Sequence, residues 1–163
     1  MVCWVRGHFK NIHGELEFDS DKPEGSAVNL TINSIDIWTG DEARDAHLRS
    51  EDFLHTEKHP LMEFKSTGIT LIGENEYEVD GELTICGVSK PVTLDVKYLG
   101  EWLTPFWEDG VDKGPRRRIG FVATTKINRH DFGVSWNGDL DKGGVVVGRD
   151  VLITIDVEAL LKE

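Results

Sequence analysis

The chain has 163 residues, of which 39% are apolar and 29% charged, and its formal net charge is −12. This length predicts one domain, residues 1–163, with room for a sizeable core. The negative charge argues against nucleic acid as a partner, because nucleic-acid binding requires a basic face. The sequence contains no apolar run of about 18 residues, so it predicts no transmembrane segment.

The N-terminal segment reads MVCWVRGHFKN. It lacks the basic stretch followed by an apolar stretch that a signal peptide requires. As given, the sequence therefore predicts a cytoplasmic protein, whereas a natural start further upstream would allow a periplasmic or secreted one. The two cysteines, Cys3 and Cys86, belong to no CxxC pair and indicate neither a zinc ribbon nor a redox motif.

Alternation of polar and apolar residues dominates the chain and is typical of antiparallel strands with one wet face. It runs through residues 15–18, 28–32, 62–64, 69–71 (with the opposite parity to 62–64), 77–85, 92–98 and 151–157. The apolar positions change parity after Ile32, where Ile35 and Ile37 follow. This shift predicts a β-bulge.

Polar segments that contain glycine or proline separate these strands. Residues 72–76 and 86–90 predict hairpin loops, and residues 19–25 predict a polar connection. Residues 101–115 and 131–148 predict two longer loops.

One segment, residues 42–50, favours helix, because it holds good helix formers and Asp41 can cap it. A short helix inserted in an all-β chain usually lies over one end of the sheet or barrel. Six or seven strands at hairpin spacing predict an antiparallel barrel or sandwich, and a closed barrel leaves no exposed edge strand. The interior of a small barrel is either filled by side chains or holds one ligand, and the alternation leaves both open.

Residues with catalytic or metal-binding chemistry form no recognisable site. His55 and His59 lie four apart, but Thr56 stands where a metalloprotease has glutamate, and Pro60 disfavours a helix through His59. Cys86 lies in an apolar strand pattern and is interpreted as a small core residue. We therefore predict no enzyme, no metal site and no cofactor.

Six segments stand out when they are read together: VRGHF at residues 5–9, TGDEARDAHLRSEDF at 39–53, HPLMEFKST at 59–67, GELTICGVSKPVTLDV at 81–96, INRHDFGVSW at 127–136 and VLITIDVE at 151–158. In this order and spacing they resemble the YceI-like family of polyisoprenoid-binding proteins. The resemblance implies an all-β, antiparallel, lipocalin-like β-barrel with an apolar bore and a short helical insertion near residues 42–50. It also implies a protein that is not an enzyme and binds a long isoprenoid or other amphiphilic lipid.

From this resemblance we expect the chain to bind, and to transport or store, an isoprenoid or fatty-acyl lipid in the bore, in a role such as the stress response. Eight apolar side chains, chosen by alternation, are predicted to line the cavity: Phe9, Phe18, Leu30, Ile32, Phe64, Phe121, Trp136 and Ile153. Arg44, His47 and Arg49 are predicted to contact an anionic head group at the mouth. A purely structural network, in which Asp45 and Asp52 pair with the arginines, is an equal alternative.

Two other functions stay open. A lipocalin-like hydrolase or isomerase would need a polar site in the bore, such as His8 or His130 beside a carboxylate. A stress-related scaffold would have a filled core. The aromatic residues Trp102, Phe106 and Trp107 either contact a membrane or partner, or form a small satellite core under a long loop.

The resemblance also carries an expectation about the N-terminus. Family members usually have a further segment, including a first strand, before the stretch matched by VRGHF. That first strand is expected to be missing here. Its absence would leave two exposed strand edges and favour a homodimer formed through them.

Overall fold

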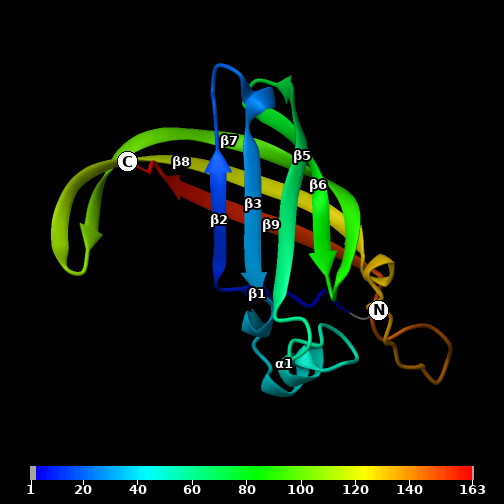
Figure 1. Ribbon diagram of the computed structural model, residues 1–163. Helices are drawn as coiled ribbons and strands as arrows, with labels where there is room; N and C mark the ends of the chain where they lie inside the picture. Colours follow the sequence, from blue (N-terminus) through cyan, green and yellow to red (C-terminus); the bar gives the residue numbers. More distant parts are fainter. Residues whose placement is uncertain (1–2, 163) are drawn as a thin grey trace.

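The computed structural model describes residues 3–162. Seven strands form one antiparallel sheet in the order β2-β3-β5-β6-β7-β8-β9 (Figure 1). Their bounds are β2 Ile12–Glu17, β3 Ala27–Asn33, β5 Leu61–Gly73, β6 Glu76–Ile85, β7 Val88–Glu108, β8 Val111–Asn128 and β9 Asp150–Leu160. The short strands β1 (His8–Phe9) and β4 (Ile37–Trp38) form a separate pair. The predicted all-β, antiparallel, lipocalin-like architecture is confirmed.

The large sheet curls on itself, so that its first and last strands lie on opposite sides of an apolar interior (Figure 1). Among the described residues, no ladder joins the edge strands β2 and β9. The barrel is therefore a half-barrel with an open seam. Lys162, just after β9, reaches across this seam and donates from Nζ to Oε1 of Glu15 in β2 at 2.8 Å.

Three hairpins connect β5, β6, β7 and β8, each through a two-residue turn. The closing pairs are Gly73↔Glu76, Ile85↔Val88 and Glu108↔Val111. Each turn contains a non-glycine residue with positive φ: Asn75 at 59°, Cys86 at 52° and Asp109 at 52°. Such φ values match the twist of a two-residue hairpin. The hairpins predicted at residues 72–76 and 86–90 are confirmed.

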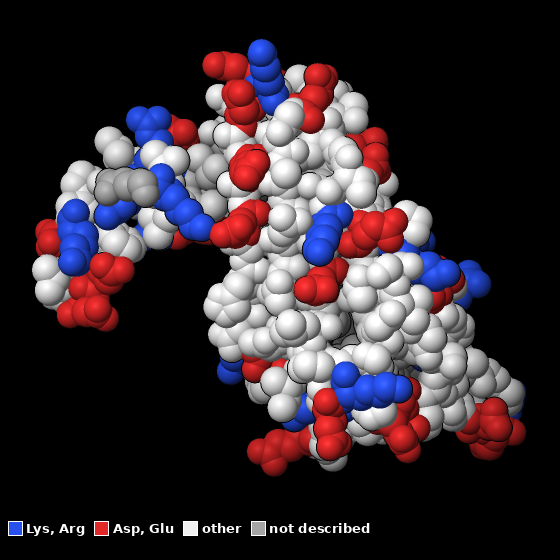
Figure 2. All heavy atoms as spheres, in the orientation of Figure 1, with Lys and Arg blue, Asp and Glu red and all other residues white. Residues whose placement is uncertain are grey.

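The prediction of a long loop at residues 101–115 is wrong. Residues 99–118, which we call the arm, form the outer part of the β7–β8 hairpin, and the arm stands out from the body as a separate lobe (Figure 2). Two prolines of this segment, Pro105 and Pro115, lie opposite each other in the arm. A missing N–H is tolerated there because each arm strand has an open outer edge.

The predicted helix is confirmed as α1 (Glu42–Arg49), and Asp41 caps it by accepting a hydrogen bond from the Arg44 N–H at 2.9 Å. The predicted bulge after Ile32 is wrong: the 3₁₀ turn η2 (Ser34–Asp36) shifts the parity. Two further 3₁₀ turns are η1 (Pro23–Gly25) and η3 (Arg129–Phe132). No helix within the described residues is long and apolar enough to cross a membrane.

Side chains fill the end of the half-barrel that lies next to α1. We call it the plugged end, and it comprises α1, residues 50–60, η3 and residues 133–148. Buried side chains of these segments, Phe53, Phe132 and Val134, pack in one cluster with side chains of the strands, which include Met62, Phe64, Leu83, Ile85 and Ile127. Phe132 is only 2% exposed. The same core cluster also includes Leu30, Val79, Leu94 and Ala123, so it continues along the barrel beyond this end.

Candidate ligand-binding cavity

An apolar cavity of about 70 Å³ lies in the half of the barrel away from the plugged end. All seven strands of the large sheet contribute to its lining, because inward positions recur at every second residue. The lining residues are Leu16, Phe18, Ser26, Val28, Leu30, Ile69, Tyr77, Val79, Leu94, Val96, Phe121, Ala123, Ile155 and Val157. This lining is chemically suited to hydrocarbon, because it offers a guest apolar contacts and almost no hydrogen bonds.

Four aromatic rings, which we call the aromatic cluster, pack together at the cavity. The Phe18 ring centre lies 5.3 Å from Phe121, 5.6 Å from Tyr98 and 6.4 Å from Tyr77. Tilted or edge-on contacts at such distances are attractive. Burial raises the pKa of Tyr98, and the nearby Glu101 charge and Tyr77 raise it further. Tyr98 therefore keeps its proton beside the apolar interior.

Three of the eight apolar residues predicted to line the cavity do so: Phe18, Leu30 and Phe121. Phe64 belongs to the buried core and is 3% exposed. Four others, which are partly buried, pack against this core instead: Phe9, Ile32, Trp136 and Ile153. Leu30 belongs to both groups, because the core cluster continues into the cavity lining.

The prediction missed most of the lining, although several missed residues lie in segments with clear alternation. Leu94 and Val96 in β7, and Ile155 and Val157 in β9, share the parity of an inward face. Alternation identifies which face of a strand points inward. It does not give the position along the strand at which the filled core ends and the cavity begins. That position depends on strand register, for example Val96↔Ala123, which the sequence does not reveal.

The two arginines of α1 bind the preceding backbone. Arg44 donates from Nε to the Thr39 hydroxyl at 2.7 Å and from Nη2 to the Thr39 carbonyl at 2.9 Å. Arg49 donates from Nε to the Ile35 carbonyl and from Nη2 to the Ile37 carbonyl, both at 2.8 Å. These contacts hold residues 35–39 against the helix. Neither arginine lines the cavity.

Asp45 completes this network from within the helix. It is 4% exposed and accepts hydrogen bonds from the Thr39 hydroxyl and, at 2.9 Å, from the Thr39 N–H. The Thr39 hydroxyl bond is the main cause that lowers the pKa of Asp45; burial opposes it, and Arg49 and Arg44 assist it. The carboxylate therefore stays ionised at neutral pH and ties α1 to the chain before it.

His47, which also lies in α1, packs within the plugged end. Its Nε2 lies 2.8 Å from Oδ2 of Asp52, and its ring packs edge-on against Phe53 and Trp136, with ring centres 5.0 and 4.6 Å apart. These contacts are structural, but the pairs differ from the predicted alternative: Asp45 binds Thr39 and Asp52 lies beside His47, whereas the arginines bind residues 35–39. Contact of Arg44, His47 or Arg49 with a lipid head group stays a prediction.

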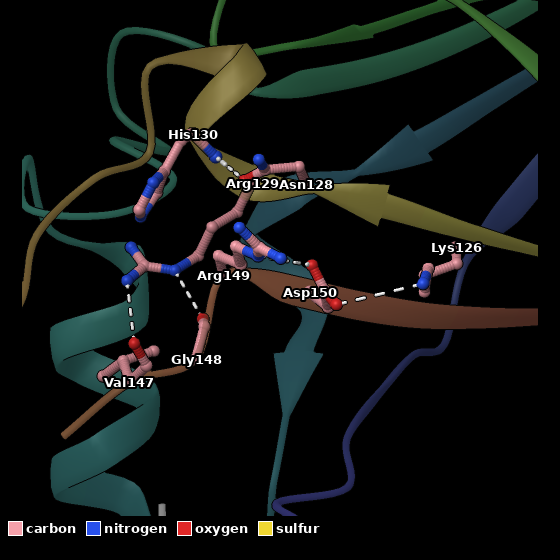
Figure 3. A network of polar contacts seen from close by, with 8 residues as sticks. All are labelled: Lys126, Asn128, Arg129, His130, Val147, Gly148, Arg149 and Asp150. Atoms are coloured by element: carbon pink, nitrogen blue, oxygen red, sulfur yellow. Dashed lines mark hydrogen bonds and ion pairs between the residues drawn. The ribbon is translucent and has the colours of Figure 1, made fainter. Parts of the chain in front are cut away.

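Arg129, in the NRHDFG segment, fixes the glycine-rich loop of residues 133–148. Its side chain is buried, with the residue 6% exposed. Figure 3 shows the guanidinium directed toward the carbonyls of Val147 and Gly148, at the C-terminal end of this loop. It donates to the Gly148 carbonyl at 2.8 Å and to the Val147 carbonyl at 3.2 Å. It also donates to the Val134 carbonyl at 2.8 Å. Burial lowers the pKa of Arg129, and the three carbonyls compensate for the lost water.

Cys86 links a hairpin to the plugged end. Its thiol lies 3.3 Å from the Phe53 carbonyl and 3.4 Å from the Leu54 carbonyl, and burial raises its pKa. A raised pKa disfavours the reactive thiolate. The predicted packing role fits this placement. Within residues 3–162, no group of three or more His, Cys, Asp or Glu side chains is arranged to hold a metal ion.

The histidines suggested for the rival enzyme lie outside the cavity. His8 is exposed and packs against Trp38, with ring centres 4.9 Å apart. His130 is also exposed, and its backbone N–H donates to the side chain of Asn128 at 3.0 Å (Figure 3). Neither histidine is positioned to act on a molecule held in the apolar interior.

Comparison with known sequences identifies one family. The model described as YceI-like domain matches residues 1–159. The UPF0312 protein of Ectopseudomonas mendocina is 37% identical over 132 residues, which cover 81% of this chain and 65% of that protein. Protein YceI of Escherichia coli O157:H7 is 37% identical over 153 residues, which cover 94% of this chain and 73% of that protein. The chain thus spans slightly less than two thirds of the Ectopseudomonas relative.

A solved structure supports the fold. The crystal structure of the Campylobacter jejuni YceI protein superposes with a TM-score of 0.81 and 30% sequence identity. The superposition covers 100% of this chain and 88% of that one. The curled sheet of this chain therefore has the same fold as that protein.

Proposed function

Because this chain belongs to the YceI-like family, we propose that it binds a long-chain isoprenoid or other amphiphilic lipid in the apolar cavity and carries or stores it. The observation that carries the proposal is the lining, to which all seven strands contribute apolar side chains. Burial of each methylene group contributes about 0.8 kcal/mol, so a hydrocarbon tail needs no specific polar contact. The proposed role involves no covalent chemistry.

The volume of the cavity sets a requirement on this mechanism. Pockets that enclose a whole ligand usually measure about 300–1,000 Å³, whereas this cavity measures about 70 Å³. A long tail therefore requires the half-barrel to widen. The open seam makes widening feasible, because separating β2 from β9 breaks no ladder hydrogen bond between them. The Lys162–Glu15 contact across the seam joins two highly exposed side chains, and such pairs are weak.

The small volume favours a second candidate function, a stress-related scaffold whose core is filled. In that case the remaining space is an ordinary packing defect of about two water volumes, at about 30 Å³ for each water. The two functions differ in one respect: only the lipid carrier requires the cavity to be occupied.

Mass spectrometry of an organic extract of the protein, purified from its native host, tests the carrier function. We expect a prenyl or fatty-acyl lipid in stoichiometric amount. Ala123→Phe should abolish it, because Ala123 lines the cavity and the new ring would fill it. Thr124→Phe is the matched control, since the neighbouring residue is exposed on the other face. An empty extract, together with no binding of added lipid, would favour the scaffold.

The same seam leads us to propose a homodimer. Among the described residues, β2 and β9 each have a ladder partner on one side only, and unpaired strand edges favour pairing with another chain. Light scattering during size-exclusion chromatography measures the mass in solution. A monomer across the working concentration range would contradict the dimer and leave the carrier function unaffected.

A further inference from the structure

The inward face of the barrel continues beyond the cavity onto the arm. In β8, Ala123 and Phe121 line the cavity, and every second residue of a strand shares a face. The register between β8 and β9 is uninterrupted from Arg118 to Asn128. Ile119 and then Arg117 therefore follow Phe121 on the same face.

The partner strands confirm this assignment. Ile119 lies opposite Ala159 in β9, just as Phe121 lies opposite Val157, which also lines the cavity. On the β7 side, Ile119 lies opposite Glu101. Along the inward face, the aromatic cluster is therefore followed first by the apolar residue Ile119 and then by the charged residues Glu101 and Arg117.

Arg117 and Glu101 form an ion pair on this inward face. Arg117 Nη1 lies 2.6 Å from Glu101 Oε1, and the side chains are 54% and 41% exposed. A guanidinium has five N–H donors in a fork that matches phosphate and carboxylate oxygens. The contact with Glu101 uses Nη1, so further donors remain available to a ligand. Glu101 follows Tyr98 by three residues in β7, which places this pair beside the aromatic cluster.

The two neighbouring arginines lie on the opposite face. Arg118 contacts Glu158, and Arg116 lies over the Phe106 ring, with its guanidinium carbon 5.3 Å from the ring centre. Of the three consecutive arginines, Arg117 alone therefore shares the face of the cavity lining. Its Cα lies four residues beyond that of Phe121, about 13 Å along the strand.

We propose that Arg117 binds the anionic head group, a phosphate or a carboxylate, of an amphiphile whose tail lies in the cavity. The proposal rests on the lipid-carrier function and adds the class of head group and its position. The tail occupies the apolar interior, the aromatic cluster surrounds the point where it leaves, and the head group accepts hydrogen bonds from the guanidinium. Glu101 holds Arg117 in place when no ligand is bound.

Calorimetric titration of the full chain tests the proposal with four probes. Farnesyl phosphate and palmitate carry anionic heads, whereas farnesol and hexadecanol have the same tails with neutral heads. We expect Arg117→Gln to weaken binding of at least one anionic probe about 10- to 100-fold, as expected for the loss of charge-assisted hydrogen bonds. Farnesol and hexadecanol should bind unchanged. The anionic probe that is weakened identifies the head as phosphate or carboxylate.

Arg116→Gln is the matched control, since it removes the adjacent charge from the other face and should leave all four affinities unchanged. Arg117→Lys should retain part of the affinity for the anionic probe, and Glu101→Gln should strengthen it. Equal effects of Arg117→Gln and Arg116→Gln, with the neutral probes still bound, would overturn the head-group site alone. Failure of all four probes to bind the wild-type chain would overturn the carrier function and the head-group site with it.

Discussion

Arginine has two different uses at the two ends of this half-barrel. At the plugged end, Arg44, Arg49 and Arg129 donate mainly to backbone carbonyls, and Arg129 is buried. In the arm, Arg117 contacts a carboxylate and is half exposed. A guanidinium whose donors are taken up by carbonyls organises the chain. One that is exposed beside an apolar interior has donors left for a ligand.

The comparison also explains why the most specific short stretches of the sequence do not line the cavity. RDAHLRSEDF, CGVSKP and NRHDFG all lie at the plugged end or contact it. They combine capping, positive-φ turns and buried polar bonds, which need particular residues at particular positions. The cavity needs only apolar side chains of suitable size, so it leaves a weak pattern in the sequence.

The largest expected effect on stability compares the plugged end with the end that holds the cavity. Phe132→Ala should lower the free energy of unfolding by about 3–5 kcal/mol, because a fully buried ring leaves a void in packed surroundings. Phe18→Ala should lower it by roughly 1–2 kcal/mol, since this ring is partly exposed and already borders empty space. Urea unfolding measures both. Equal losses would show that the two ends are equally well packed.

Removal of the buried guanidinium should have the next largest effect. Arg129→Leu should cost about 2–4 kcal/mol, because it leaves three buried or half-buried carbonyls without their charged donor. Arg149→Leu is the control, with a side chain that is 71% exposed, and should change stability by less than about 0.5 kcal/mol. Limited proteolysis should cleave residues 133–148 faster in Arg129→Leu. Wild-type proteolysis rates in this variant would show that other contacts hold the loop.

Shortening the arm should have a small effect on stability. Replacing residues 104–116 by Asn-Gly would close the hairpin at the Leu103↔Arg117 pair and keep Glu101. The Tm should change by less than about 4 °C, because an isolated two-stranded ribbon contributes little net stability. Binding of an anionic amphiphile should persist, since the proposed site lies at the root of the arm. Loss of binding with the fold intact would move the site to the tip.

The sequence predicted the strand pattern, the capped helix and two of the hairpins, because each depends on neighbouring residues. The prediction of a loop at residues 101–115 was wrong, because the pairing of the two arm strands, for example Pro105↔Pro115, is a non-local fact. We also chose Arg44, His47 and Arg49 from their charge and position, whereas their hydrogen-bond partners became visible only in the structure. A sequence does not show which polar side chains already have hydrogen-bond partners within the protein.

The smallest effect concerns the ionisation of Asp45 at the plugged end. The Thr39 hydroxyl lowers the pKa of Asp45 in the folded chain below its unfolded value, so the charged form stabilises the fold. That contribution is present above the unfolded pKa of about 3.9 and disappears as pH falls through the lower folded pKa. The Tm advantage of the wild-type chain over Asp45→Asn should therefore be constant near neutral pH and shrink below about pH 4. Thr39→Val, which removes the main cause of the lowered pKa, should reduce the same pH dependence. An advantage that grows on acidification would mean that Asp45 is stabilised in its protonated form, and that the α1 network holds a neutral side chain.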